Sequence, residues 1–544
     1  MNAPRVLLYD TILRDGSQME GIAFSLEDKL AIAHRLDEIG VHYIEGGFPG
    51  SNEKDRLFFQ EIKRAPLKQA KVVAFGGTRR AGLQVQDDPN IQAIADAGTA
   101  VVTLVGKASR YQVRVALETS GEENLAMIAD SVAHFKALGR EVGFDAEHFF
   151  DGFRGDPDYA LQTLRTAARA GADTLILCDT NGGALTPDLV RAIEAAKQAV
   201  PQAQLGIHVH DDAGLAVANS LAAVSAGVEQ VQGCFNGYGE RCGNANLATI
   251  LATLQLKMGI PVVGDAQLAR LTELSRYIAE LANLPLDPQA PYVGVSAFAH
   301  KAGYHVAAVV KDEDTYQHAK PAAVGNDRRV LVSELSGQRN ISYKLQERGL
   351  DLPLTAEETR ALLDRVKQME SRGYQYEGAE ASFELLAHRA RPNYTAPFEL
   401  EDFLIVERRR HTADLTDREA GSGAAENGGR NEMLAEAMAK VGVAGQLFQT
   451  AAEGNGPVNA LDRAVRKGLR EAYPALDRMH LLDYKVRILD AAAGTEAKVR
   501  VLIESTDGEH IWNTVGSSTD VIEASWLALA DAFEYFLLKQ EEWG

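Results

Sequence analysis

The stretch LGIHVHDD, residues 205–212, decides the interpretation of the fold, because a short apolar segment ends there in a cluster of polar side chains. Side chains alternate across a β-strand, so the apolar residues take one face while His208 and His210 take the other. Apolar runs of this length that end in polar turns are typical of buried parallel strands. The stretch therefore predicts a strand of a parallel sheet with two imidazoles side by side near its carboxyl end.

The same pattern recurs along residues 1–260, where short apolar runs, polar turns and segments with helical spacing alternate. Eight runs are predicted to be strands, at 5–9, 41–45, 71–75, 100–105, 141–146, 174–178, 205–210 and 229–234. Helical spacing follows most of them, for example at 26–39, 124–138 and 187–199. Eight strand–helix units in about 250 residues predict a TIM (β/α)8 barrel. On the pattern alone, a doubly wound open sheet is the main alternative.

The pattern changes after residue 260, and we divide the chain into three predicted parts. Residues 1–275 form the α/β barrel, residues 276–395 form helical accessory or linker subdomains, and residues 396–544 form a C-terminal α+β domain. Within the accessory part, the spacing predicts one helix over 265–285 and helical structure over 355–390.

The C-terminal part contains both kinds of secondary structure. Residues 484–489 and 497–503 are predicted to be paired strands around a turn at 493–496, and residues 521–539 to be an amphipathic helix. Residues 411–432 are polar and rich in glycine, which predicts a mobile loop or an insertion. We assign no function to that segment.

The composition argues against several classes of protein. The 544 residues include 56 Lys and Arg but 76 Asp and Glu, and the net charge of −20 argues against nucleic acid or an anionic membrane as the main partner. Three cysteines without a CxxC pair are typical of a reducing cytoplasm, where we expect the protein to act. Neither a signal peptide nor an apolar run of about 18 residues is evident, so we expect no membrane insertion.

The strongest chemical signal is the pair His208 and His210, because two imidazoles on one face of a strand make half of a metal site. The plain alternative is a pair of hydrogen-bonded histidines in a polar barrel core. The strand ends in Asp211 and Asp212, at the barrel face where catalysis usually takes place, which favours metal binding.

The second signal is YDTILRDG, residues 9–16, at the end of the first predicted strand. Asp10 and Asp15 offer carboxylates, and Arg14 offers a guanidinium that can hold an oxyanion. Alone, the motif is explained equally well as an Asp-Gly turn with solvated charges. In a closed barrel the first, seventh and eighth strands lie close together, so the polar groups of these strands can converge.

The loop after the eighth strand, GCFNGYGERCGNANL (233–247), allows close backbone approach through its glycines. Asn244 and Asn246 offer carbonyl oxygens to a hard cation, although a flexible loop that leads into a helix explains the segment as well.

Two further strand ends carry polar residues. Glu147 and His148 follow the fifth strand, and Asp179 and Thr180 follow the sixth. These groups can serve as a base or bind a substrate carboxylate, or they can simply cap helices and turns.

Together these segments resemble one known family. The four motifs occur in family order, and they are DTILRDG (10–16), CDTNGG (178–183), HVHDDAGLAVANS (208–220) and NGYGERCGNANL (236–247). The family is that of the isopropylmalate, homocitrate and citramalate synthases, to which the HMG-CoA lyases are related. The resemblance continues in AFAHKAGYHVAAV (297–309), AEGNGPVNALDRAV (452–465) and the segments at 483–489 and 515–526, and it covers nearly the whole chain except 411–432.

The resemblance implies a set of metal ligands. Carried over motif by motif, they are Asp15, His208, His210 and Asn244. This ligand set accepts Mn²⁺, Mg²⁺, Co²⁺ or Zn²⁺. Cys234 departs from the family pattern, in which many synthases carry a threonine, and we interpret it as a small buried thiol.

The resemblance also implies substrate-binding and catalytic residues. Arg14 and Asp15 bind the 2-oxo acid, Arg14 polarises it, and Thr180 holds its carboxylate. Glu147 matches the family's catalytic glutamate. His305 and Tyr316 match catalytic residues of the accessory segment, which is expected to reach a neighbouring subunit's barrel.

Within the group, GFDAEHFFDG (143–152) and the stretch from Tyr316 to SELSGQRN (333–340) are most similar to the citramalate synthases. This similarity implies condensation of acetyl-CoA with pyruvate to (R)-citramalate and CoA, in a homodimer that serves isoleucine biosynthesis. It also implies that the C-terminal domain is regulatory and binds an amino-acid effector, isoleucine.

Other functions stay open from the sequence. The acceptor can be 2-oxoisovalerate or 2-oxoglutarate instead, because one or two methyl groups give only about 1–3 kcal/mol of discrimination. A lyase that breaks the same bond and a non-catalytic amino-acid sensor built on the barrel are the remaining alternatives. The native metal, the effector-binding residues and the identity of the catalytic base also stay open.

Overall fold

The computed structural model describes residues 6–331, 355–391, 393–412, 430–489 and 496–543. Their contacts group into two compact units, each described by itself below. The first unit comprises Met1–Phe298 and Gln317–Arg328, and the second comprises Ala299–Tyr316 and Arg329–Gly544. The predicted three-part division of the chain stays a prediction.

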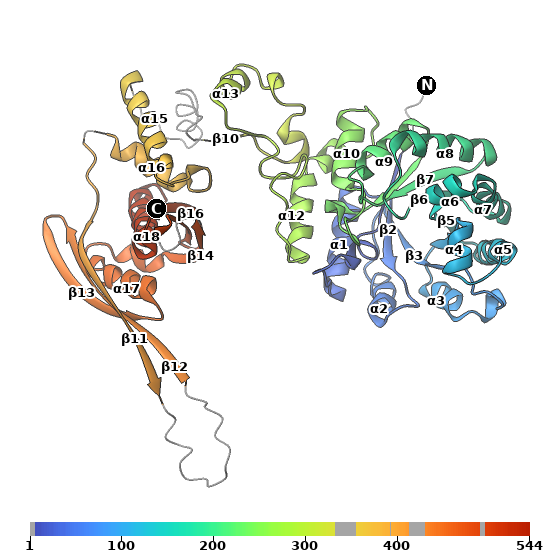
Figure 1. Cartoon of the computed structure of the whole chain (residues 1–544), viewed down its shortest axis with the longest axis horizontal. Helices are drawn as coiled ribbons and strands as arrows, with labels where there is room; N and C mark the ends of the chain where they lie inside the picture. Colours follow the sequence, from blue (N-terminus) through green and yellow to red (C-terminus); the bar gives the residue numbers. More distant parts are fainter. Residues whose placement is uncertain (1–5, 332–354, 392, 413–429, 490–495, 544) are drawn as a thin grey trace, which may run out of the picture. The chain divides into compact units, whose positions relative to one another are not determined.

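The first unit contains a closed barrel of eight parallel strands in the order β1 to β8 (Figure 1). The strands are β1 (Leu7–Asp10), β2 (Tyr43–Gly47), β3 (Lys71–Gly77), β4 (Val101–Lys107), β5 (Glu141–Glu147), β6 (Thr174–Asp179), β7 (Gln204–Val209) and β8 (Gln230–Gly233). Pairing of β1 with β8, from Leu7 beside Gln230 to Asp10 beside Gly233, closes the sheet and excludes the open-sheet alternative. The predicted TIM barrel is therefore confirmed.

Helices surround the strands of this barrel (Figure 1). They are α1 (Leu26–Ile39), α2 (Glu53–Glu61), α3 (Pro89–Ala97), α4 (Arg110–Val115), α5 (Gly121–Ala137), α6 (Phe149–Gly155), α7 (Pro157–Ala170), α8 (Thr186–Ala199), α9 (Ala216–Ser225), α10 (Leu247–Leu256), α11 (Asp265–Leu268) and α12 (Leu271–Leu281). Helix α1 shows why such segments begin and end where predicted. Ser25 and Asp28 form a capping box at its start, and Gly40 ends it in the left-handed conformation.

The predicted single helix over 265–285 is wrong in one respect, because the segment forms two helices. Arg270 leaves the helical conformation, with φ −100° and ψ 5°, and separates α11 from α12. An ideal Cβ at Gly325 would lie 2.0 Å from the carbonyl oxygen of Ala269, so the chain at 325 packs directly against the break. A contact between residues this distant in sequence is invisible to helical spacing.

The second unit is α+β, as predicted. Its helices are α13 (Gly303–Val309), α15 (Ala356–Ser371), α16 (Glu380–Arg389), α17 (Pro457–Leu469) and α18 (Val521–Trp543). Its strands are β9 (Ala299–His300), β10 (Arg329–Val330), β11 (Glu399–Thr412), β12 (Arg430–Val443), β13 (Gln446–Gly454), β14 (His480–Ile488), β15 (Val499–Thr506) and β16 (Ile511–Ser518). The paired strands predicted near 484–503 are confirmed as β14 and β15, whose pairing is antiparallel.

Two three-stranded antiparallel sheets, β11–β12–β13 and β14–β15–β16, organise the C-terminal domain. Alternate alanines and valines of β12 are buried against α17, while β15 and β16 pack on α18. Most of 411–432, the turn at 493–495 and the family-like stretch 333–340 lie outside the described residues. None of the described helices is long and apolar enough to cross a bilayer.

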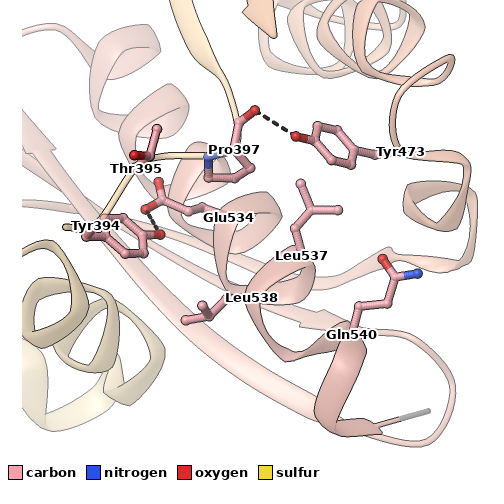
Figure 2. A pocket seen from close by; sticks show the side chains of 8 residues that line it. All are labelled: Tyr394, Thr395, Pro397, Tyr473, Glu534, Leu537, Leu538 and Gln540. Atoms are coloured by element: carbon pink, nitrogen blue, oxygen red, sulfur yellow. Dashed lines mark hydrogen bonds between the residues drawn. The ribbon is translucent and has the colours of Figure 1, made fainter. Parts of the chain in front are cut away.

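Helix α18 also holds the segment that precedes β11 (Figure 2). The Tyr394 hydroxyl donates to Glu534 on α18 at 2.7 Å, and the Tyr473 hydroxyl donates to the Pro397 carbonyl at 2.8 Å. These residues and Leu537 line a cavity of about 400 Å³.

Candidate active site

Three side chains from the ends of two strands, β1 and β7, meet at the carboxyl-end face of the barrel. Asp15 follows β1, His208 lies on β7, and His210 directly follows β7. The Nε2 atoms of the two histidines are 3.3 Å apart, and they lie 3.3 and 3.8 Å from the same carboxylate oxygen of Asp15. All three residues are buried. The alternation in LGIHVHDD therefore places both imidazoles where the sequence predicts them.

These distances fit a bound divalent cation. Ions with ligand distances of about 2.0–2.2 Å hold neighbouring ligand atoms roughly 3 Å or more apart, which matches the spacing of the three atoms. His210 also faces Asn244 across an isolated antiparallel bridge. The Oδ1 atom of Asn244 is buried and has no hydrogen-bond partner among the described residues, so an oxygen ligand is available beside the histidines.

The electrostatics of this cluster keep the ligand atoms of Asp15 and His210 deprotonated. Burial would raise the pKa of Asp15, but the charges of Arg14 and His208 hold it well below its usual range. Burial, together with the charge of His208, lowers the pKa of His210 to about 4. Burial would also lower the pKa of His208, but its hydrogen bond with Asp15 raises it. The Asp15 carboxylate and the His210 imidazole can therefore donate electron pairs to a cation, whereas His208 must first release the proton that it shares with Asp15.

Arg14 lies beside the cluster in a fixed orientation. Its Nε donates to Glu45 on β2 at 2.5 Å, one of its terminal nitrogens is 3.5 Å from Asp15, and its guanidinium stacks 4.0 Å from the centre of the Phe75 ring. The Tyr9 hydroxyl donates to the other oxygen of Glu45 at 2.5 Å. The guanidinium is thereby aimed at the metal side of the site, where it can stabilise a developing oxyanion.

The side chains of Asn244 and Asn246 have different roles in the structure. The side-chain oxygen of Asn246 accepts from the backbone N–H of Ala248 at 3.0 Å and caps α10, so that oxygen is already in use. The amide nitrogen of Asn244 donates to the Tyr238 carbonyl at 3.1 Å, which leaves its oxygen free to face inward. Of the two candidates from the sequence, the structure favours Asn244.

Thr180 lies at the end of β6, next to the end of β5. Its hydroxyl accepts from the backbone N–H of His148 at 2.8 Å, and its own proton remains available for a substrate carboxylate. Arg241 joins the neighbouring loops, because it donates to the Thr180 carbonyl at 2.8 Å and to both oxygens of Asp212 at 2.8 and 3.0 Å. Asp179 instead accepts the backbone N–H of Ala184 and stabilises its own turn.

Glu147 lies at the end of β5 and forms an ion pair with Lys107 at the end of β4. Both residues line a cavity of about 490 Å³ over the ends of β3, β4 and β5. Arg79 and Arg80 line the same cavity, and Arg79 is paired with Glu123 and Asp130. A carboxylate that an ion pair fixes beside a cavity can act as a base toward a substrate bound there.

His305 and Tyr316 belong to the second unit. Their rings stack with centroids 4.3 Å apart, and both side chains are exposed. The structure therefore places His305 and Tyr316 next to each other. It separately brings together five predicted residues on the barrel: Arg14, Asp15, His208, His210 and Asn244.

Sequence reasoning missed three buried polar residues of the barrel interior: Glu45 on β2, Asp145 on β5 and Gln232 on β8. The signal was present, since each is a polar residue near the end of a short buried strand. Cys234 is buried, with its sulfur 3.2 Å from the Thr11 hydroxyl, in agreement with a small buried thiol.

Three family models match successive parts of the chain. The model described as HMGL-like matches residues 5–278, the homocitrate synthase post-HMGL domain-like model matches 292–374, and the LeuA allosteric (dimerisation) domain matches 377–537. The chain is similar over its whole length to curated proteins. It is 48% identical to the (R)-citramalate synthase of Aquifex aeolicus (strain VF5), over 100% of this chain and 99% of that protein.

Two further (R)-citramalate synthases are similarly close. That of Geobacter sulfurreducens is 50% identical over 99% of this chain and 98% of that protein, and that of Synechocystis sp. is 49% identical over 97% and 96%.

A TIM barrel with a candidate divalent-metal centre at its carboxyl-end face is the class that the fold and the site define. The chain belongs to the HMGL-like family and, within it, to the family of the (R)-citramalate synthases. This membership confirms the predicted family and the predicted enzyme class, an acyltransferase.

Proposed function

We propose that the protein condenses acetyl-CoA with pyruvate to give (R)-citramalate and CoA, and that this product serves isoleucine biosynthesis. The observation that carries the proposal is the convergence of Asp15, His208 and His210 within 3.3 to 3.8 Å, with Arg14 beside them. Full-length similarity to (R)-citramalate synthases supports pyruvate as the acceptor over 2-oxoisovalerate and 2-oxoglutarate.

Asp15, His208, His210 and Asn244 would hold a divalent ion, which would supply Lewis acidity for the 2-oxo acid. Arg14 binds the keto oxygen of pyruvate and stabilises the negative charge that develops on it, because Glu45 and Phe75 hold its guanidinium in place. The Thr180 hydroxyl donates a hydrogen bond to the carboxylate of pyruvate. These residues leave C2 of pyruvate as the electrophile.

The acetyl end of acetyl-CoA occupies the cavity over β3, β4 and β5 in this proposal. Glu147, whose carboxylate is held by the ion pair with Lys107, accepts a proton from the methyl group. The resulting enolate carbon attacks C2 of pyruvate and forms the new C–C bond, and the keto oxygen takes up a proton. Water then cleaves the thioester, which releases CoA and the second carboxylate of citramalate.

His305 and Tyr316 complete the catalytic set from the accessory segment of a neighbouring subunit. Their stacked, exposed rings form a compact polar group that can approach a barrel mouth from outside. His305 shares the proton transfers with Glu147. The match of residues 377–537 to a LeuA allosteric (dimerisation) domain supports a homodimer.

The test of the function uses purified protein with acetyl-CoA, Mn²⁺ and one 2-oxo acid at a time. We expect release of free CoA, measured with a thiol reagent, with pyruvate and not with 2-oxoisovalerate or 2-oxoglutarate. Asp15→Ala and His210→Ala should lose turnover and metal binding together. Release of CoA with another acid alone would reassign the acceptor, and no release with any acid would favour the sensor.

We propose that the C-terminal domain binds an amino-acid effector, isoleucine, which inhibits the reaction. The matched allosteric domain supports this assignment. Isoleucine should inhibit the full chain, and a chain cut before about residue 400 should no longer respond. Inhibition that persists after the cut would place the effector elsewhere.

A further inference from the structure

We propose that Gln232 positions His208 for metal binding, and that Asp145 in turn fixes the orientation of Gln232. The inference rests on the proposed metal centre and assigns roles to two residues outside its ligands. His208 on β7 and Gln232 on β8 are direct neighbours in the strand register. Both residues are therefore presented side by side by the barrel itself.

The contacts form one continuous chain of hydrogen bonds across the barrel interior. Gln232 approaches Nδ1 of His208 with its side-chain oxygen at 3.1 Å, and its amide nitrogen donates to Oδ1 of Asp145 at 3.3 Å. Gln232 is completely buried and Asp145 is 4% exposed. Bulk water is therefore excluded as a substitute partner for either group.

The polarity of this chain determines which nitrogen of His208 carries its proton. A primary amide has a donor end and an acceptor end. Once the donor end faces the Asp145 oxygen, the acceptor end is the one that faces His208. Nδ1 of His208 then carries a hydrogen, so Nε2 is the nitrogen that can bind a cation once the proton it shares with Asp15 is released.

Nε2 of His208 is the atom that faces the other candidate ligands, at 3.3 Å from both Asp15 and His210. A histidine ligand commonly donates its second ring N–H to an outer partner that sets its tautomer and ring orientation. Gln232 occupies that outer position here. The geometry therefore assigns Gln232 and Asp145 as positioning residues, because neither is placed to contact the ion itself.

Gln230 provides a matched control on the same strand. It lies two residues before Gln232, so it projects to the same interior face of the barrel, and it is buried as well. Its side-chain oxygen has no hydrogen-bond partner among the described residues. Replacement of either glutamine with leucine makes the same chemical change, but only the change at position 232 removes a contact with His208.

The experiment measures Mn²⁺ affinity of the full-length protein by the loss of the free-ion electron paramagnetic resonance signal. We expect Gln232→Leu to weaken binding about 10- to 100-fold, whereas Gln230→Leu binds as the wild type does. Asp145→Asn, which allows the amide to turn, should give a loss smaller than that of Gln232→Leu.

The visible absorption of the Co²⁺-loaded protein provides a second readout, which should change for Gln232→Leu and not for Gln230→Leu. Equal Mn²⁺ affinity in wild type and Gln232→Leu would overturn the proposal, and unchanged affinity in Asp145→Asn would remove Asp145 from it. If the wild type bound no Mn²⁺, the proposed metal centre itself would fail. If Gln232→Leu does not fold, Gln232→Met, which also removes the amide, takes its place, and wild-type Mn²⁺ affinity in that variant would equally overturn the proposal.

Discussion

Gly243 holds Asn244 in position without a side chain of its own. Its φ is +90°, and an ideal Cβ would lie 2.0 Å from the carbonyl oxygen of Gly237. Alanine at this position costs about 1–2 kcal/mol for the left-handed conformation alone, and the clash forces the loop to move. We predict that Gly243→Ala weakens Mn²⁺ binding about tenfold or more, although no ligand atom is removed.

Gly183, in the loop after β6, supplies the control for this prediction. Its φ lies outside the left-handed region, and an added Cβ would meet no atom within 4 Å. Gly183→Ala should therefore bind Mn²⁺ as the wild type does. Equal affinities for the two variants would show that Asn244 contributes little to the metal centre.

The buried carboxyl of Asp10 makes the stability of the barrel depend on pH, and a single substitution can test this contribution. Its carboxyl is completely buried and accepts the backbone N–H groups of Ile12 and Phe235. Burial raises its pKa from 3.8 to about 7. The folded protein therefore binds this proton more tightly than the unfolded chain, so stability is greatest below the unfolded pKa and falls until the pH passes about 7.

Asp10→Asn should remove this part of the pH dependence. The free energy of unfolding of the wild type should fall relative to that of the variant between about pH 4 and pH 7, by up to about 4 kcal/mol. The asparagine loses one acceptor, but that loss is independent of pH. Urea denaturation at several pH values measures the difference between the two proteins, and parallel curves would contradict the assignment.

At the scale of elements, the strands of the barrel could be predicted because each is a local apolar run with a polar end. Helix α1 was predicted at its exact bounds, since its caps are adjacent in sequence. The break between α11 and α12 could not be predicted, because it depends on the close approach of Gly325 to the backbone of Ala269. The same limit applies to the site. His208 and His210 were visible from strand alternation alone, whereas Gln232 and Asp145 acquire their roles only when β8 and β5 face each other across the interior.

The interface between α16 and α18 is held by buried charges. Arg389 donates to Glu534 at 3.0 and 2.6 Å and to Asp531 at 2.8 Å, and Asp531 also accepts from Ser382 at 2.6 Å. Both carboxylates are buried. The Arg389 side chain is 38% exposed, so solvent screens the pairs, and removal of its guanidinium from the two buried carboxylates costs about 1–2 kcal/mol.

Arg389→Ala should therefore lower the stability of the C-terminal domain by about that amount. Tryptophan fluorescence reports on this domain alone, because the three tryptophans of the chain are at 512, 526 and 543. Arg391→Ala, at an exposed arginine two residues later, should leave the urea midpoint unchanged. A similar midpoint for both variants would mean that the buried pairs stabilise the interface little.

At the scale of the whole molecule, one face of the β11–β12–β13 sheet packs on α17 while the other exposes apolar side chains. Leu404 is 56% exposed and lies opposite Met438, which is 37% exposed. Exposed apolar side chains that are neighbours on a sheet face are typical of association surfaces. The match of this region to a dimerisation domain supports the same interpretation.

We therefore predict that Leu404→Glu shifts the protein from dimer to monomer at micromolar concentration, measured by sedimentation velocity. The added carboxylate is well hydrated on a free surface but costs several kcal/mol when it is buried without a partner. Val521→Glu, at a 43% exposed valine outside both sheets, should leave the dimer intact. If Leu404→Glu also sediments as a dimer, the contact must lie elsewhere, and the edge strand β14, with Leu482 and Ile488 exposed, is then the surface to change.

Because His305 and Tyr316 are proposed to act in a neighbouring subunit's barrel, a monomeric Leu404→Glu variant should also lose turnover while its Mn²⁺ affinity is retained. That combination separates the assembly of the active site from the integrity of its metal centre.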